Sequence, residues 1–220
     1  MGEMPQSGSQ LLAVGPWLPE AVHASWTADP YIPTEEATAA ADVELQGLKD
    51  RGSPSHDGLA ARLAAWEQTP DGLVMSLQPA RWALRLLDGA DIASLSALCV
   101  VRSADGQWLA GRRADWVASW PGRWALGAGG AVEVSENPVE SMTRELEEEW
   151  SAVPEHLSIE ALVQVPSGMT LLVGTATLPD GMEVTPDAEH DEFMWWPADI
   201  NDWPDEADAP LRAMAAMLNR

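Results

Sequence analysis

The chain has 220 residues, 46% of them hydrophobic, and a formal net charge of −23 at pH 7. Its length fits one large domain, or one domain with a substantial extension, and its hydrophobic content suffices to bury a core. Nucleic acid and anionic membranes require a basic surface, so the charge argues against both as partners. The sequence shows no signal-peptide pattern, no run of membrane-spanning length and a single cysteine, Cys99, which excludes an internal disulfide. These features are typical of a soluble cytoplasmic protein.

The first part of the chain carries no recognisable chemical motif. Residues 1–33 mix Pro, Gly and Ser with scattered apolar positions, which favours an irregular lead-in with Trp17 and Trp26 docked on the body. Thr34 is a candidate N-cap for a helix of about 15 residues that ends before Gly52.

A hairpin is predicted next. Two apolar arms, 58–68 and 73–87, flank the turn signal Thr69-Pro70-Asp71-Gly72. The alanines of the first arm would also suit a helix, but the turn favours a strand. No flexible linker precedes Ser94, so we expect the hairpin to pack on the domain that follows or on a second copy of it, in a homodimer. Residues 1–92 are therefore predicted to be an N-terminal extension.

Strand and helix patterns alternate from residue 93 to the end of the chain. We predict two further hairpins, at 94–114 and 159–178, and between them a strand at 123–130 that runs into three glycines and a central helix at 137–150. A late apolar segment at 189–200 and a final amphipathic helix at 209–220 follow. Such a mixture predicts an α/β fold whose sheet is covered on both faces.

The central helix has clear start signals and one apolar side. Asn137 is a candidate N-cap, Pro138 suits the first helical position, and Glu140 stands where a capping-box acid reaches back. The apolar residues recur at helical spacing: Val139, Met142, Leu146 and Trp150.

Another side of the same helix carries clustered acids. Glu145, Glu148 and Glu149 are related as i, i+3 and i+4, so they fall within an arc of roughly 100°. Like charges at this spacing oppose helix formation, and a hard divalent cation such as Mg²⁺ or Mn²⁺ would neutralise them. Taken alone, the cluster would more simply be a solvated helix face.

The longer spacing around these acids resembles the Nudix box. Gly130 is followed after five residues by Glu136, and after seven more by Arg144-Glu145-Leu146, one residue and Glu148-Glu149. Ser151 departs from the pattern, because the family has its second glycine there. The resemblance covers residues 93–220 and implies the α/β/α sandwich of that family, with a mixed sheet.

The resemblance also implies a metal site. Glu145, Glu148, Glu149 and the carbonyl of Gly130 would hold Mg²⁺ or Mn²⁺, and Arg144 would fix a carboxylate by a bidentate contact. The alternative for Arg144 is an ordinary surface ion pair.

The sequence pattern does not single out one residue for the general base or for the substrate contacts. Family members often use an acid on the late loop, where Glu192 fits best and Glu189 and Asp191 are rivals; the neighbouring His190 is expected on the surface. Three arginines near the glycine strand are candidates for phosphate contacts, or else pair with surplus acids: Arg112, Arg113 and Arg123. Three tryptophans before the glycines would stack on a flat group, or else belong to the core: Trp116, Trp120 and Trp124.

The function implied is metal-dependent hydrolysis of a diphosphate linkage in a small molecule, a nucleoside diphosphate linked to another group. Nucleotide sugars, ADP-ribose-like compounds and nucleotides belong to this class. The alternative is a Nudix-fold module that binds a nucleotide or regulates without turnover. The intact Arg144-Glu145-Leu146 and Glu148-Glu149 pattern favours the enzyme.

Overall fold

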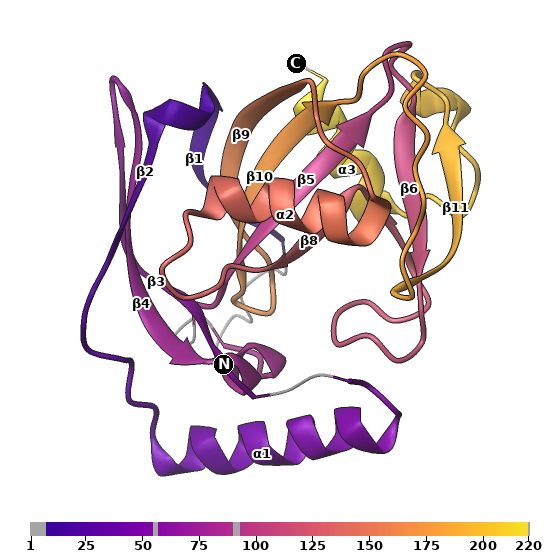
Figure 1. Ribbon diagram of the computed structural model, residues 1–220. Coiled ribbons are helices and arrows are strands. Elements are labelled where there is room, and N and C mark those ends of the chain that lie inside the picture. Colours follow the sequence, from indigo (N-terminus) through magenta and orange to yellow (C-terminus); the bar gives the residue numbers. More distant parts are fainter. Residues whose placement is uncertain (1–7, 55–56, 90–92, 220) are drawn as a thin grey trace, which may run out of the picture.

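The computed structural model describes residues 8–54, 57–89 and 93–219, and a large mixed sheet lies at its centre (Figure 1). The strands of this sheet are β1 (Gln10–Trp17), β5 (Leu95–Arg102), β6 (Trp108–Arg113), β7 (Trp124–Leu126), β8 (Ala128–Ala131), β9 (His156–Gln164), β10 (Thr170–Thr177) and β11 (His190–Trp196). Their order is β1-β9-β10-β5-β6-β11, with β8 beside β5 and β7 beside β6. Only β10 and β5 run parallel; the other pairs are antiparallel.

Helices cover both faces of the main sheet. Helix α2 (Pro138–Trp150) lies across one face and α3 (Ala209–Leu218) lies behind the other (Figure 1). Successive residues of a strand point to opposite faces, and in β5 Cys99 belongs to the core under α2 while Val100 belongs to the core under α3. The apolar run of β5 reflects burial on both sides. The α/β/α sandwich expected from the resemblance is therefore confirmed.

The irregular lead-in expected for residues 1–33 is wrong over much of its length; residues 1–7 lie outside the described part. β1 pairs with β9 and extends the main sheet, and β2 (Val22–Trp26) pairs with β4. β1 contains Gly15-Pro16 and two register shifts, so its sequence lacks the regular alternation that identifies a strand. The expected docking of tryptophans is confirmed, since Trp26 Nε1 donates to the Glu136 carbonyl at 3.0 Å and Trp17 packs against the core.

The helix and hairpin predicted after this segment are confirmed. Helix α1 covers Glu35–Asp50, and the Thr34 hydroxyl accepts a hydrogen bond from the Ala37 amide at 3.1 Å. The hairpin strands are β3 (Leu59–Thr69) and β4 (Gly72–Arg81), and a short 3₁₀ helix at Trp82–Leu86 follows. Its second arm is therefore shorter than predicted.

The small sheet β2-β4-β3 packs directly on the main domain. Met75 and Leu77 of β4 are fully buried in the same core as residues of α2. The Ala61 amide donates to the Val132 carbonyl at 2.8 Å, so a main-chain hydrogen bond also joins β3 to the segment that follows β8. The limit placed at residue 92 falls in a segment outside the described residues.

Two predicted strand arrangements differ in the structure. β5 and β6 share one register pair, Arg102 with Trp108, because β8 and β7 lie along the rest of them. The strand predicted over 123–130 is divided at Gly127, whose φ of 65° turns the chain from β7 into β8. A Cβ at Gly127 would lie 1.9 Å from the Cys99 carbonyl oxygen, so the close crossing requires glycine. Over the described residues, no helix is long and apolar enough to cross a membrane.

Candidate active site

Helix α2 is fixed at both ends. The Asn137 side chain accepts from the Val139 amide at 2.9 Å, and Glu140 accepts from the Asn137 amide at 3.2 Å, which confirms the predicted capping box. Near the other end, Trp150 is buried and its Nε1 donates to the Gly127 carbonyl at 3.0 Å. The capping box fixes the start of α2, and the Trp150 contact holds its other end against the turn between β7 and β8.

The acids of α2 meet the glycines of β8. A Cβ at Gly130 would lie 2.1 to 2.7 Å from the carboxylate atoms of Glu145, so this carboxylate rests on the strand backbone. Glu149 is buried, and its Oε1 accepts from the Gly129 amide at 3.2 Å. Its Oε2 is also buried but has no hydrogen-bond partner among the described residues. Glu148 differs, because 59% of its side chain is exposed.

Arg144 gathers three of the carboxylates of the box. Its guanidinium lies 2.9 Å from an oxygen of each of Glu136, Glu145 and Glu148. The hydrogen bond to Glu136 raises the pKa of Arg144. In return, although burial acts against it, the hydrogen bonds from Arg144 and Ser141 lower the pKa of Glu136. Arg144 is thus placed to position acids.

Burial changes the protonation of the acids nearest β8. It raises the pKa of Glu145 to about 7, despite the ion pair with Arg144, and raises the pKa of Glu149 well above its usual range. Buried carboxylates without full compensation disfavour their charged form. Both groups would be stabilised as anions by a nearby cation.

His190 is not on the surface as expected but buried beside these acids. Its ring lies 4.5 Å from the Trp150 ring, and its Nε2 is 3.8 Å from the Glu149 carboxylate. Room for it exists because the neighbouring strand β6 has a glycine, Gly111, where a Cβ would lie 2.4 Å from the imidazole. Burial lowers the pKa of His190 to about 4, so it is neutral near pH 7.

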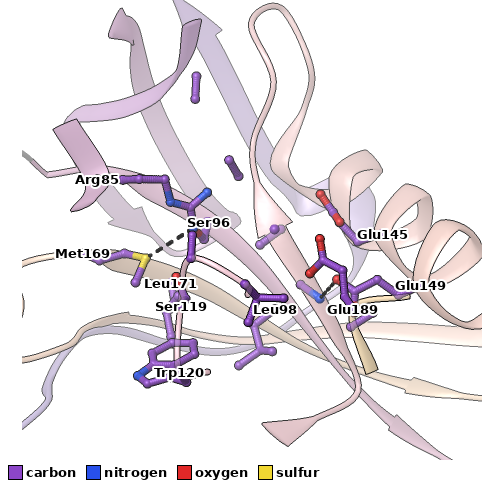
Figure 2. Close-up of a pocket in the computed structure, with 18 of the residues that line it drawn as sticks. Arg85, Ser96, Leu98, Ser119, Trp120, Glu145, Glu149, Met169, Leu171 and Glu189 are labelled. Carbon is purple, nitrogen blue, oxygen red and sulfur yellow. Dashed lines mark hydrogen bonds between the residues drawn. The ribbon is translucent and has the colours of Figure 1, made fainter. Parts of the chain in front are cut away.

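A cavity of about 580 Å³ opens beside the acids. Glu145, Glu149 and Glu189 lie on one side of it, and Arg85 and Ser96 lie on the other (Figure 2). Its walls come from the main sheet, the loop around residues 116–120 and the N-terminal extension. The extension thus forms part of the site, which no motif in it indicated.

The three acids considered for the general base lie in different places. Glu189 lines the cavity, and its carboxylate accepts from Arg113 at 3.0 Å. Glu192 is exposed on β11, outside the cavity lining. Asp191 is also exposed and pairs with Arg112 at 3.3 Å.

The candidate substrate contacts are also divided. Of the three arginines, Arg113 lines the cavity, Arg112 lies outside it, and Arg123 forms an ion pair with Asp208 away from it. Of the three tryptophans, Trp116 and Trp120 line the cavity, whereas Trp124 packs in the core under α3. Arg85 and Ser96 also line the cavity, and no pattern in the sequence indicated either of them.

Some of the oxygen atoms at this site are suitable ligands for a hard divalent cation. Glu145 and Glu149 provide carboxylates at β8, and the unpartnered oxygen of Glu149 is a free acceptor within the described structure. The carboxylate of Glu148 instead contacts Arg144. Within the described ranges, no three His, Cys, Asp or Glu side chains are already grouped as metal ligands. The fit therefore rests on two acids and the glycine strand.

Comparison with known proteins identifies the family. The NUDIX domain matches residues 93–216, more than half of the chain. The chain therefore belongs to the Nudix family. No curated protein sequence matches it.

Solved structures similar to this chain include several Nudix proteins. The MutT Nudix hydrolase of Burkholderia pseudomallei has 20% identity over 57% of this chain and 97% of that one, with a TM-score of 0.46. The Nudix domain of NrtR from Shewanella oneidensis, complexed with ADP ribose, has 21% identity over 58% and 88%, with a TM-score of 0.45. DR0079 from Deinococcus radiodurans has 18% identity over 47% and 66%, with a TM-score of 0.42.

Proposed function

We propose that the protein hydrolyses a diphosphate linkage in a nucleoside diphosphate joined to another group, with Mg²⁺ or Mn²⁺ as cofactor. The observation that carries this proposal is the meeting of Glu145 and Glu149 with the glycines of β8 at the edge of a cavity of about 580 Å³. An unpartnered buried carboxylate oxygen beside a cavity favours a cation as its missing partner.

The residues that would hold the metal are Glu145, Glu149 and the carbonyl of Gly130, with Glu148 joining them if it leaves Arg144. When bound, the metal would neutralise phosphate charge and supply an activated water. Arg144 would keep Glu145 oriented through their ion pair at 2.9 Å, and the Gly129 amide would do the same for Glu149.

Glu189 is the acid best placed to accept a proton from water, since it lines the cavity next to the metal-binding acids. The ion pair with Arg113 at 3.0 Å, together with the hydrogen bond from Arg113 Nε to the Ser119 carbonyl at 3.1 Å, would fix its position. Glu192 would have to reach the site from the exposed side of β11. Trp116 and Trp120 offer flat surfaces on which a base would stack.

The test is a panel of nucleotides, nucleotide sugars and ADP ribose, incubated with Mg²⁺ or Mn²⁺ and assayed for released products. We expect turnover of at least one compound. Binding without product release would favour the alternative, a regulatory module.

Glu149→Gln should then lower turnover about 100-fold or more while the fold is kept, because a metal-binding charge is lost. Glu147→Gln is the matched control, since Glu147 lies on the exposed side of α2 and should change turnover little. Turnover of Glu149→Gln within about tenfold of the wild type would contradict the proposed site.

A further inference from the structure

Arg85 is a cation on the side of the cavity opposite the glutamates (Figure 2). It belongs to the 3₁₀ helix of the N-terminal extension, and its Nη2 donates to the Ser96 hydroxyl at 2.9 Å. Its guanidinium also lies 3.8 Å from the sulfur of Met169 and 5.5 Å from the centre of the Trp82 ring. All of these neighbours are uncharged.

The guanidinium has unused hydrogen-bonding capacity. Its Nε is buried and has no partner among the described residues, where Arg85 also forms no ion pair. Arg113, the other arginine of the cavity lining, is instead paired with Glu189 at 3.0 Å. Arg102 and Arg212 also form no ion pair within the described residues, but their guanidinium groups donate to main-chain carbonyls, whereas Arg85 donates only to a hydroxyl and a thioether.

Arg85 remains charged in this environment. Burial lowers its pKa to about 10, which leaves it protonated at neutral pH. A cation removed from water requires a counter-charge or further acceptors. The described protein provides Arg85 with only a hydroxyl and a thioether as hydrogen-bond acceptors, and Glu145 and Glu189 attract it only from across the cavity. An anion that enters the cavity would supply the missing partner.

We propose that Arg85 and Ser96 form a binding subsite for a phosphate group of the substrate, an inference that rests on the proposed function. A guanidinium contacts phosphate oxygens through two parallel N–H groups. The Ser96 hydroxyl, which donates to the Met169 sulfur at 3.4 Å in this structure, would add a donor at its side once it turns from Met169 to the phosphate. The phosphate belongs either to the cleaved diphosphate itself or to a second phosphate further along the substrate. In both cases the N-terminal extension contributes directly to substrate binding, and Arg85 offsets locally the repulsion of an anion by a chain at −23.

The first experiment uses inorganic phosphate as a probe and needs no turnover. Thermal melts of the full, metal-free chain are recorded with increasing phosphate for the wild type, Arg85→Gln and Lys49→Gln. Phosphate should raise the melting temperature of the wild type and of Lys49→Gln, whose lost charge lies exposed on α1, but not that of Arg85→Gln. An equal rise in all three proteins, or none in the wild type, would overturn the subsite. A lower melting temperature with an unchanged response to phosphate would show that Arg85 only braces its neighbours, and would overturn it too.

Arg85→Lys provides a second variant in case Arg85→Gln does not fold. It keeps the charge but loses the two parallel donors, so the response to phosphate should fall to about half or less. An undiminished response would count against the proposal.

The second experiment distinguishes the two sources of the phosphate. ADP ribose and its 2′-phosphorylated form are compared as substrates, and as inhibitors if neither is cleaved. If Arg85 contacts the cleaved diphosphate, Arg85→Gln should raise KM or the inhibition constant about tenfold or more for both compounds. If it contacts a second phosphate, only the phosphorylated compound should be affected. Unchanged constants for both would refute the subsite.

The proposed function and the subsite fail in different ways. An Arg85-dependent response to phosphate without turnover of any compound would remove the hydrolase proposal and leave the subsite. Turnover that is unchanged in Arg85→Gln would leave the hydrolase proposal and remove the subsite.

Discussion

The carboxylate of Glu145 rests on the backbone of β8 at a position that has no side chain. Gly130 leaves this space, and the neighbouring Gly129 leaves a different one, in which a Cβ would lie 2.7 Å from the Ala97 carbonyl oxygen. The two glycines therefore allow different close contacts. Gly130 leaves room for the flexible side chain of Glu145, whereas Gly129 leaves room for the backbone of the neighbouring strand β5.

Gly130→Ala should lower turnover while the protein stays folded. The added methyl would displace the Glu145 carboxylate, which is the movable end of its side chain, and a displacement of about 1 Å at a catalytic group costs about 100-fold in rate. Turnover and thermal melts of the variant test this together. A melting temperature close to that of the wild type is expected, and undiminished turnover would contradict the placement of Glu145.

Gly129→Ala is the informative comparison. Its methyl would press on the backbone of β5, which cannot move without disturbing the sheet. Stability and turnover should therefore fall together, in contrast to the selective loss at Gly130.

At the residue scale, the sequence predicted the acids of α2 but not Arg85. Glu145 and Glu149 are separated by one helical turn, so their common side follows from spacing alone. Arg85 reaches the same cavity through the packing of the extension on the main sheet, and its Ser96 partner lies on β5. No local pattern encodes such a contact. For the same reason Glu189 and Glu192 were not distinguishable before their places around β11 were known.

At the element scale, helix α2 ends at a residue in a strained conformation. Ser151 has φ 52° and ψ 35°, the left-handed region, and its amide donates to the Glu147 carbonyl at 2.9 Å. Glycine adopts this conformation without the steric cost that a side chain brings. The departure from the Nudix box at this position thus lies at the C-terminal end of α2, two residues after Glu149.

Ser151→Gly should raise the free energy of unfolding by roughly 0.5–1 kcal/mol without altering turnover. Denaturant unfolding measures the first quantity and the panel substrate the second. A destabilised variant would mean that the serine side chain contributes something at this helix end that the backbone geometry does not indicate.

Elements stabilised by contacts between residues close in the sequence were predictable, and elements that depend on contacts with distant parts of the chain were not. Helices α1 and α2 carry their own caps, and the hairpin of β9 and β10 encloses its own turn. β1 and β2 carry no such signal, because each becomes a strand only by pairing with a partner far along the chain, β9 and β4. The division between β7 and β8 likewise depends on the crossing of Gly127 over Cys99.

At the scale of the whole molecule, the extension and the Nudix domain share one core. Removal of the chain before Ser94 would take away the edge strand β1, the small sheet and the cavity wall that carries Arg85. It would also expose apolar residues of the main sheet that now pack against Met75 and Leu77. The shortened protein should be poorly soluble or less active, because the buried apolar surface is lost. Full activity with an unchanged melting temperature would refute this dependence.

Burial of acids on α2 makes the stability of the whole molecule depend on pH. The pKa of Glu145 is about 7 in the folded protein, against about 4.5 for a free side chain. Between these values the folded state binds more protons than the unfolded state, so stability falls as the pH rises from about 4.5 through 7 and stays low above it. Burial of Glu149 acts in the same direction. His190 opposes them below its usual pKa, because burial keeps it neutral.

Glu145→Gln should therefore melt higher than the wild type at pH 8 in metal-free solution, and the difference should shrink toward pH 5. The contribution of His190 is common to both proteins and cancels in this difference. Mg²⁺ or Mn²⁺ that binds only the folded state adds about 2.7 kcal/mol at a hundredfold excess over its dissociation constant. The wild type should gain more from metal than Glu145→Gln, because it offers one more anionic ligand. Thermal melts of both proteins at pH 5 and pH 8, with chelator and with each metal, measure the pH-dependent difference in stability and the gain from metal. An equal gain from metal in the two proteins would mean that Glu145 does not hold the cation, and the proposed chemistry would lose one of its two buried acids.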